Sequence, residues 1–237
     1  MHSQAAIVGN TARKVRWTPE VEREQPKSLR SAIDLKVIDA FGTVVLVGRD
    51  QEIFAEGDSS EFCYRLIAGA VRLVKLMPDG RRQIAEFHLP RDLFGFEICD
   101  TRYLSAEAVV DCTLIRYPRR RIEAIAEHDP EFARYLREMA SGNLRRAHER
   151  MMLLARKSAD ERIASFLEEM TERCGAKATT IELPMSRVDI ADYLGLTLET
   201  VSRVLNRLHR DHVITLASAT HIEVPDHGAL RELAGDL

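Results

Sequence analysis

The sequence predicts an α+β protein in three parts: an N-terminal antiparallel β-barrel or jelly roll, one long helix and a C-terminal helical domain with a small hairpin. Three observations support this. Short apolar or alternating runs separated by turn residues fill the region from Val44 to Tyr117. A long stretch with helical periodicity follows from Pro130 to Arg156. Two short capped helices separated by Gly195 lie near the C-terminus.

Length and composition limit the class of protein. The 237 residues give room for two modest domains, and the formal net charge of −3 excludes a chain that attracts polyanions over its whole surface. No apolar run approaches the length of a bilayer span, and the N-terminus lacks a signal-peptide core. The four cysteines are widely spaced and fit no zinc pattern. We therefore expect a cytoplasmic protein with free thiols, no metal and no membrane partner.

Residues 1–40 are expected to form an N-terminal arm with a short helix over 28–38, because Pro19 and Pro26 interrupt any longer helix. Residues 41–128 are expected to form the barrel. Its strand-like runs are TVVLVG, CYRLIAGAVRLVKL, RQIAEFHL, SAEAVV and CTLIRY. Pro78-Asp79-Gly80 between two alternating runs predicts a hairpin.

The long helix has clear start signals. Pro118 ends the strands and a short helix over 119–127 precedes Asp129, which caps a helix with Pro130 at its first position. A helix over 130–156 would be roughly 40 Å long. One narrow apolar stripe follows it: Phe132, Leu136, Ala140, Leu144, Ala147, Met151 and Leu154. The stripe could pack on its own barrel, but the length favours contact with a second copy, so residues 129–156 are interpreted as a dimerisation helix.

Residues 157–237 form the predicted C-terminal domain. Ser158 and Glu161 make a capping box for a helix that runs to about Arg173 and stops at Gly175. ATTIEL predicts a strand, HVITL and HIEV predict a hairpin, and residues 226–233 predict a final short helix. A hairpin after the helices is a wing that can rest on a nucleic-acid backbone.

Between strand and hairpin lies a helix-turn-helix pattern. Ser186 caps a first helix over Arg187–Leu194 with Asp189 as its capping-box partner, Gly195 ends it, and Thr197 caps a second helix over Leu198–Arg210. Apolar residues occupy the positions where the helices must touch: Ile190, Leu194, Leu196, Val201 and Val204. Ala191 is small where the second helix passes closely. The pattern predicts a winged helix-turn-helix that binds double-stranded DNA, and the alternative is an ordinary αα-hairpin.

The outward residues at the start of the second helix are Leu198, Glu199, Ser202 and Arg203. Arginine can donate to guanine O6 and N7, and glutamate can accept from cytosine N4. Alternatively, the Glu199 carboxylate only stabilises the N-terminus of the helix through the helix dipole, or Glu199 and Arg203 form a surface ion pair. Farther along, Arg207 and Arg210 could contact phosphates or remain solvated.

The arrangement resembles the Crp/Fnr family of bacterial transcription regulators over about residues 40–225. The barrel matches the family's turn pattern at residues 53–58 and at Leu66, Gly69, Val71 and Arg72. The segment DIADYLGLTLETVSRVLNRL resembles the Fnr and FixK branches. The resemblance implies a cyclic-nucleotide-binding-like barrel and a homodimer.

For the DNA site, the resemblance places Glu199, Ser202 and Arg203 at base-reading positions and Leu198 where Crp has an arginine. Residues expected at the DNA backbone are Ser186, Arg187, Thr197, Thr200 and Arg207. It also implies a TTGA–six bases–TCAA palindrome, RNA polymerase as a partner, and an activator of microoxic respiration and nitrogen-fixation genes.

Departures from the family pattern concern the sensor. No cysteine precedes Cys63, so the thiolates for an iron–sulfur cluster are missing. In Phe94-Gly95-Phe96-Glu97 the glutamate of the nucleotide site is displaced by one residue, and Ser105 has no arginine beside it. Arg102 would need a register shift to substitute. We expect activity with no cofactor and no effector; the alternative is a ligand-gated regulator whose barrel binds a cyclic nucleotide or other small anion.

Chemistry elsewhere is sparse. Cys63, Cys99 and Cys112 are expected to be buried and inert, and Cys174, beside Gly175, is expected to be the most exposed and is the candidate redox thiol. A helix C-terminus does not activate a thiol, which argues against such control. A metal-dependent barrel enzyme would need clustered ligands, whereas the barrel offers only His88. We predict no catalytic residues and no enzyme activity.

Overall fold

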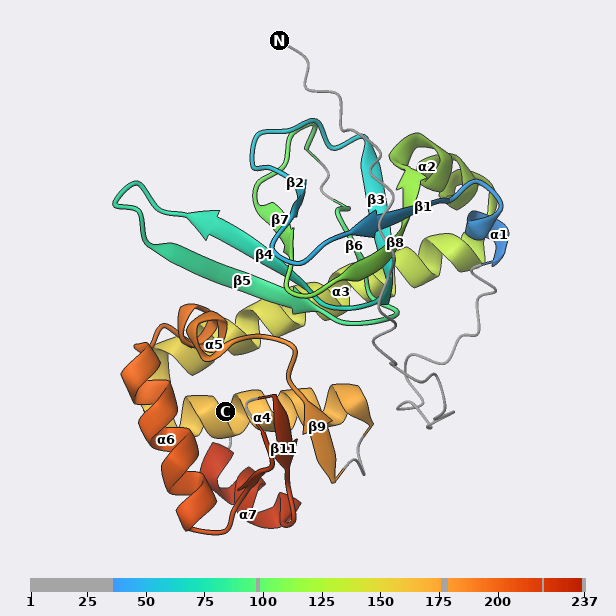
Figure 1. Cartoon of the computed structure of the whole chain (residues 1–237). Coiled ribbons are helices and arrows are strands. Elements are labelled where there is room, and N and C mark those ends of the chain that lie inside the picture. The colour runs from blue at the N-terminus through green and yellow to red at the C-terminus, as the bar shows by residue number, and fades with distance from the viewer. Residues whose placement is uncertain (1–35, 97–98, 176–178, 219, 236–237) are drawn as a thin grey trace.

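The computed structural model describes residues 36–96, 99–175, 179–218 and 220–235. Figure 1 shows a β-rich N-terminal part, the long helix α3 crossing beneath it, and a smaller helical part that contains the C-terminus. The predicted helix over 28–38 lies largely outside the described residues, which begin with α1 (Lys36–Asp39).

The described part of the barrel consists of two four-stranded antiparallel sheets. The first has the order β1 (Thr43–Val47), β8 (Cys112–Pro118), β3 (Phe62–Ala68), β6 (Leu93–Phe94). The second has the order β2 (Glu52–Phe54), β7 (Ser105–Ala108), β4 (Val71–Leu76), β5 (Arg82–His88). The predicted hairpin is confirmed, since β4 pairs with β5 around Pro78-Asp79-Gly80. It projects from the barrel toward α5 (Figure 1).

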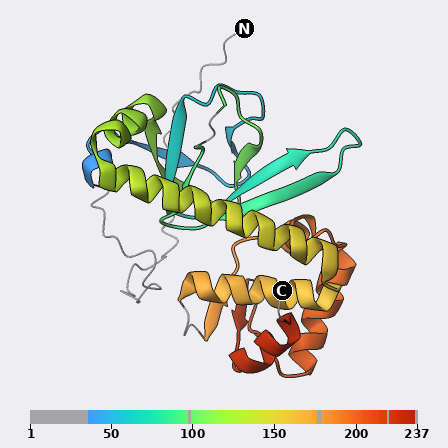
Figure 2. The same ribbon diagram turned by 180° about the vertical axis from the view of Figure 1, so that it is seen from behind.

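Helix α2 (Arg119–His128) leads into α3 (Pro130–Arg156), whose bounds are those predicted. The Asp129 carboxylate accepts from the Glu131 and Phe132 amides, and Pro130 needs no partner at the first position. Phe132 is 2 % exposed and packs in its own protomer's core with Ile38 and Tyr117. The first turns of α3 are therefore held by the barrel, and Figure 2 shows the helix running along the outside of the molecule beyond them.

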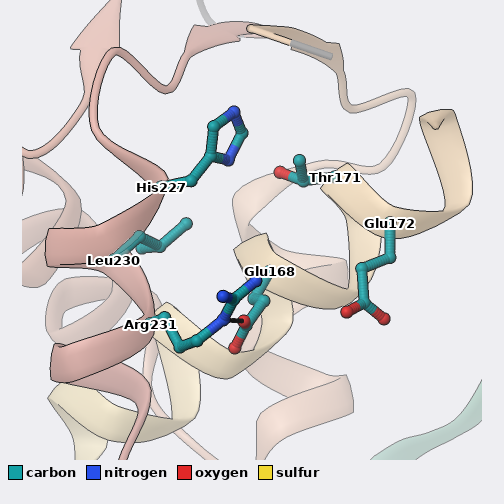
Figure 3. A pocket seen from close by; sticks show the side chains of 6 residues that line it. All are labelled: Glu168, Thr171, Glu172, His227, Leu230 and Arg231. Carbon is teal, nitrogen blue, oxygen red and sulfur yellow. Dashed lines mark hydrogen bonds and ion pairs between the residues drawn. The ribbon is translucent and has the colours of Figure 1, made fainter. Parts of the chain in front are cut away.

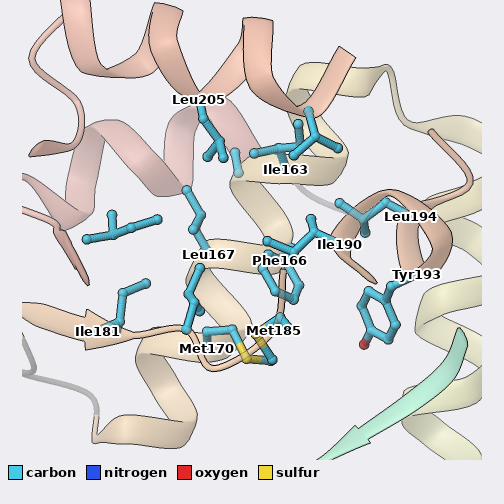
Figure 4. Close-up of a cluster of buried hydrophobic side chains, with 14 of the residues drawn as sticks. Ile163, Phe166, Leu167, Met170, Ile181, Met185, Ile190, Tyr193, Leu194 and Leu205 are labelled. Carbon is cyan, nitrogen blue, oxygen red and sulfur yellow. The ribbon is translucent and has the colours of Figure 1, made fainter. Parts of the chain in front are cut away.

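The C-terminal part begins with α4 (Ala159–Cys174), capped by the predicted Ser158–Glu161 box, and ends with α7 (His227–Ala234). Between them lie β9 (Thr180–Glu182), α5 (Arg187–Leu194), α6 (Leu198–Arg210), β10 (Thr215–Leu216) and β11 (His221–Glu223). In the described residues β11 pairs with both β9 and β10. The core, drawn in Figure 4, is built on one face of α4, which carries Ile163, Phe166, Leu167 and Met170 at helical spacing.

Two predictions about thiols were wrong. Cys174 is half-buried, because it follows Phe166 and Met170 at intervals of four on the face of α4 that packs into the core, and burial raises the pKa of its thiol. Cys99 is exposed, although the sequence suggested burial. Cys63 and Cys112 are buried as predicted, and burial raises the pKa of Cys112 to about 11. Cys174 is therefore not the most accessible thiol.

No helix in the described ranges is long and apolar enough to cross a membrane.

Candidate nucleic-acid interface

The turn between α5 and α6 has the predicted geometry. Ser186 Oγ accepts from the Asp189 amide at 3.1 Å, and Asp189 Oδ2 accepts from the Ser186 amide at 3.0 Å, which completes the capping box. Gly195 ends α5 at φ 62°, ψ 41°, a left-handed conformation that costs glycine little. The Leu196 amide then donates to the Ala191 carbonyl at 3.0 Å. This turn directs the chain into α6.

Helix α6 is amphipathic. Val201, Val204, Leu205 and Leu208 are each at most 3 % exposed and pack against α4 and α5. The Thr197 hydroxyl caps the N-terminal end of α6 by accepting from the Thr200 amide at 3.2 Å. With its inner face fixed in the core, α6 keeps its opposite face in solvent.

The four predicted base-reading residues lie together on the open side of α6. Leu198 is 41 % exposed despite its apolar side chain, Glu199 and Arg203 are exposed, and Ser202 is half-buried. Arg203 Nη2 donates to Thr200 Oγ1 at 3.4 Å and, among the described residues, makes no ion pair with Glu199. The ion-pair alternative is therefore absent from this structure, and both charges are available to a ligand.

The predicted backbone-contacting residues frame this face. Ser186 and Thr197 are the exposed N-caps of α5 and α6, where helix amides can meet an anion. Arg187 and Thr200 are half-buried in the first turns of the two helices. Arg207 is in an ion pair with Asp160 of α4, so its charge is partly compensated in the free protein.

The wing is fastened to the end of α6. His209 Nδ1 lies 3.3 Å from the Ile214 carbonyl oxygen and 3.4 Å from the Leu216 amide nitrogen, at the start of the β10–β11 hairpin. At the hairpin tip the Ser218 hydroxyl accepts from the His221 amide at 3.0 Å. The hairpin is thus a defined extension of the exposed helix.

A pocket lies between α4 and α7 and is lined by Glu168, Thr171, Glu172, His227, Leu230 and Arg231 (Figure 3). Arg231 Nε lies 2.9 Å from Glu168 Oε1, which ties α7 to α4. Burial, together with the Glu168 charge, raises the pKa of Glu172. None of these lining residues is on α6, so the pocket is separate from the reading face.

The barrel interior is occupied by its own side chains. Phe54, Tyr64 and Phe94 pack with ring centroids 5.4 to 6.3 Å apart. The Arg102 guanidinium lies 4.1 Å from the Phe54 ring centre, donates to the Gly95 carbonyl at 2.9 Å and also bonds the Phe62 carbonyl. Arg102 therefore binds barrel backbone atoms. The displaced Glu97 lies outside the described residues.

A capped helix-turn-helix with an exposed second helix, attached through a long helix to a barrel, is the architecture of a DNA-binding transcription regulator. Sequence profiles agree: residues 44–129 match the cyclic nucleotide-binding domain and residues 161–233 match the Crp-like helix-turn-helix domain. The chain belongs to the Crp/Fnr family of transcription regulators.

Its relatives include nitrogen fixation regulation proteins named FixK. The protein from Azorhizobium caulinodans is 44% identical over 207 residues, covering 86% of this chain and 84% of the relative. The protein from Rhizobium meliloti is 43% identical over 183 residues, covering 77% of this chain and 83% of the relative. The structure of FixK2 from Bradyrhizobium japonicum matches with a TM-score of 0.79 and 44% identity, over 83% of this chain and 98% of that one.

Proposed function

We propose that this protein is a homodimeric transcription activator that reads a TTGA–six bases–TCAA palindrome, one half-site per protomer, without a small-molecule effector. The observation that carries the proposal is the open face of α6, where Leu198, Glu199, Ser202 and Arg203 stand clear of the protein core. The names of the FixK relatives, nitrogen fixation regulation proteins, support control of nitrogen-fixation genes. Control of microoxic-respiration genes, recruitment of RNA polymerase and a cytoplasmic location complete the proposal.

Helix α3 supports the dimer. Beyond the turns packed on the barrel, Ala140, Leu144, Ala147 and Met151 are exposed at spacings of four and three, with Leu144 at 58 % and Met151 at 60 %. A second α3 packed along this stripe would bury it as a coiled-coil seam. Of the other predicted interface residues, Leu136 and Leu154 are half-buried at the two ends and Phe132 stays in the protomer core. A twofold pair would present two α6 helices about one DNA turn apart, roughly 34 Å.

The packed barrel interior supports effector independence. A cyclic nucleotide would need a cation for its phosphate, and the Arg102 guanidinium is engaged with the Gly95 and Phe62 carbonyls and the Phe54 ring. Ser105, the other residue weighed for such a site, accepts from the Glu56 amide at 2.9 Å through its hydroxyl. Binding a nucleotide would require breaking these contacts.

The test is fluorescence anisotropy with the purified protein and no added ligand. Duplexes carrying the palindrome, a single half-site and a scrambled site are compared over a salt series. We expect selective binding of the palindrome that weakens with salt, because phosphate contacts release counterions. Equal affinity for palindrome and scrambled DNA would refute the proposal.

Calorimetry with cAMP and cGMP tests effector independence separately. We expect no saturable heat and no change in DNA affinity. Saturable binding that tightens the palindrome complex would favour the ligand-gated alternative.

A further inference from the structure

The barrel and the DNA-reading domain meet at a junction formed by helix α5, which packs on the inner face of α6, and by Arg173 of α4, which bonds the Phe87 carbonyl and Asp92. Figure 1 shows the β4–β5 hairpin lying over α5. Arg72 on β4 and Arg82 on β5 reach across this junction to Asp189 and Asp192 of α5. These residues are more than a hundred positions apart in the chain, so tertiary packing alone brings them together.

Asp189 links the local fold of α5 to the barrel. One carboxylate oxygen, Oδ2, accepts from the Ser186 amide and the Ser186 hydroxyl, at 3.0 and 2.7 Å, and so caps α5. The other, Oδ1, accepts from Arg72 Nη1 at 3.2 Å and Arg82 Nη2 at 2.8 Å. The Asp189 side chain is 5 % exposed and that of Arg72 is 9 % exposed, so solvent screens this pair little.

Arg82 adds a second attachment at the rim of the junction. Its guanidinium contacts Asp192 Oδ2 through Nε at 2.8 Å and Nη2 at 2.7 Å. The side-chain Nε2 of the neighbouring Gln83 donates to the Asp192 backbone carbonyl at 2.5 Å. Because an arginine fork fixes direction as well as distance, Arg82 constrains the angle of α5 to the barrel.

Apolar and aromatic contacts extend the same junction. The rings of Phe87 on β5 and Tyr193 on α5 have centroids 4.9 Å apart. Arg150 of α3 lies 3.7 Å from the Tyr193 ring centre and also bonds the Tyr193 hydroxyl and the Ala85 carbonyl. Helix α5 is therefore held simultaneously by the barrel and by the helix proposed to form the dimer.

We infer that Arg72 and Arg82 are positioning residues that, through Asp189 and Asp192, fix the angle of the reading helix to the dimer axis and thereby set the spacer length between half-sites. This inference rests on the proposed function. The contacts of Arg72 and Arg82 involve α5 and leave the outward residues of α6 exposed, so the reading helix can bind DNA while these contacts persist. A loosened junction would let each α6 bind its half-site at a wider range of separations.

The test compares Arg82→Glu with a matched control, Arg81→Glu, in the full chain. Arg82 is 27 % exposed and Asp192 is 25 % exposed, so the change places a repulsive charge at the rim of the junction, facing Asp192 and the buried Asp189. Arg81 is adjacent, 80 % exposed and paired with Asp79 of its own hairpin, so its substitution makes the same change in charge away from α5. Arg82→Lys keeps the positive charge but loses the paired N–H donors of the guanidinium.

The DNA readout is the ratio of affinities for palindromes with six-base and with five-, seven- or eight-base spacers. We expect Arg82→Glu to reduce this preference at least fivefold while its affinity for a single half-site duplex stays within twofold of wild type. Arg81→Glu should keep the spacer preference of wild type, and Arg82→Lys should have a preference between those of wild type and Arg82→Glu. The double variant Arg82→Glu with Asp192→Arg should recover part of the lost spacer preference. Unchanged spacer preference in Arg82→Glu would overturn the inference, and so would tighter binding to every duplex, which would mean that the junction inhibits.

Hydrogen exchange on the free proteins separates this inference from the proposed function. We expect faster exchange of the α5 amides in Arg82→Glu than in Arg81→Glu, a result that needs no DNA. Equal exchange rates of the α5 amides in the two variants would refute the claim that Arg82 holds α5 against the barrel. Faster exchange combined with a wild-type protein that does not select the palindrome refutes the proposed function and, with it, the spacing role, while leaving the junction contacts established.

Discussion

Replacing Asp189 with asparagine should destabilise the DNA-reading domain more than the same change at the more exposed Asp192. The substitution keeps the side-chain volume but removes the charge that faces Arg72 and Arg82 and puts an amide nitrogen where an acceptor is needed. Arg72 keeps its ion pairs with Glu107 and Asp50, and Arg82 keeps Asp192, so neither guanidinium is left uncompensated. The cost is therefore that of lost buried hydrogen bonds to charged groups, about 1–3 kcal/mol, and not the larger cost of an orphaned charge. Domains are typically stable by about 5–15 kcal/mol, so the loss would be a measurable part of the total.

Equilibrium urea unfolding followed by circular dichroism measures this loss, with Asp192→Asn as the control. Asp192 pairs with the same Arg82 but is 25 % exposed, so its neutralisation should cost about 1 kcal/mol or less. If the two variants lose the same free energy of unfolding, the buried Asp189 carboxylate does not have the role assigned to it. Unfolding in two transitions would be analysed by the transition that reports on the helices of the reading domain.

Three further changes test other parts of the molecule. Leu144→Asp places a charge in the exposed stripe of α3 and should convert the dimer to monomer in sedimentation equilibrium, whereas Arg145→Asp, one residue away, should not; a dimeric Leu144→Asp variant would contradict the proposed interface. Burial would raise the pKa of Asp92, but hydrogen bonding from His88 and the Arg173 charge outweigh it, so the folded pKa lies below the unfolded one. Its contribution to stability is therefore full above about pH 4 and lost as pH falls through the folded value, and Asp92→Asn should flatten the acid limb of the stability curve; an unchanged limb would argue against it. Alkylation at pH 8 should label exposed Cys99 well before buried Cys63 and Cys112, and equal rates for Cys99 and Cys112 would contradict the described burial.

The helix-turn-helix could be predicted from sequence because its determinants are local. Ser186, Gly195 and Thr197 act within a few residues of themselves, through caps and a left-handed turn, and the bounds of α5 and α6 agree with those signals. The start of α3 followed in the same way from Asp129 and Pro130. Apolar spacing also identified the inner face of α6.

Features that depend on distant parts of the chain could not be predicted in this way. The sequence identified Asp189 as a helix cap, and nothing near it indicates that Arg72 and Arg82 share its carboxylate. The burial of Cys174, by contrast, could have been predicted, since it continues the apolar spacing of Phe166 and Met170 on α4. The ion pair of Arg207 with Asp160 on α4 also joins distant positions, and no local sequence pattern indicates it. Ion pairs between elements carry no periodic signal, so such contacts emerge only from the folded chain.

If the outward face of α6 reads base pairs, a base-substitution scan of one half-site should show which side chain reads which position. Affinities of wild type, Arg203→Ala, Glu199→Ala and Arg207→Ala are measured on every single-base variant of the half-site within the palindrome. We expect Arg203→Ala to lose about 1–3 kcal/mol of discrimination at one position and Glu199→Ala to relax the base preference at another. Arg207→Ala should weaken all duplexes about equally, as expected for a phosphate contact. If Arg203→Ala lowers affinity for random and specific DNA alike, and Glu199→Ala leaves specificity unchanged, then the outward face of α6 does not read bases.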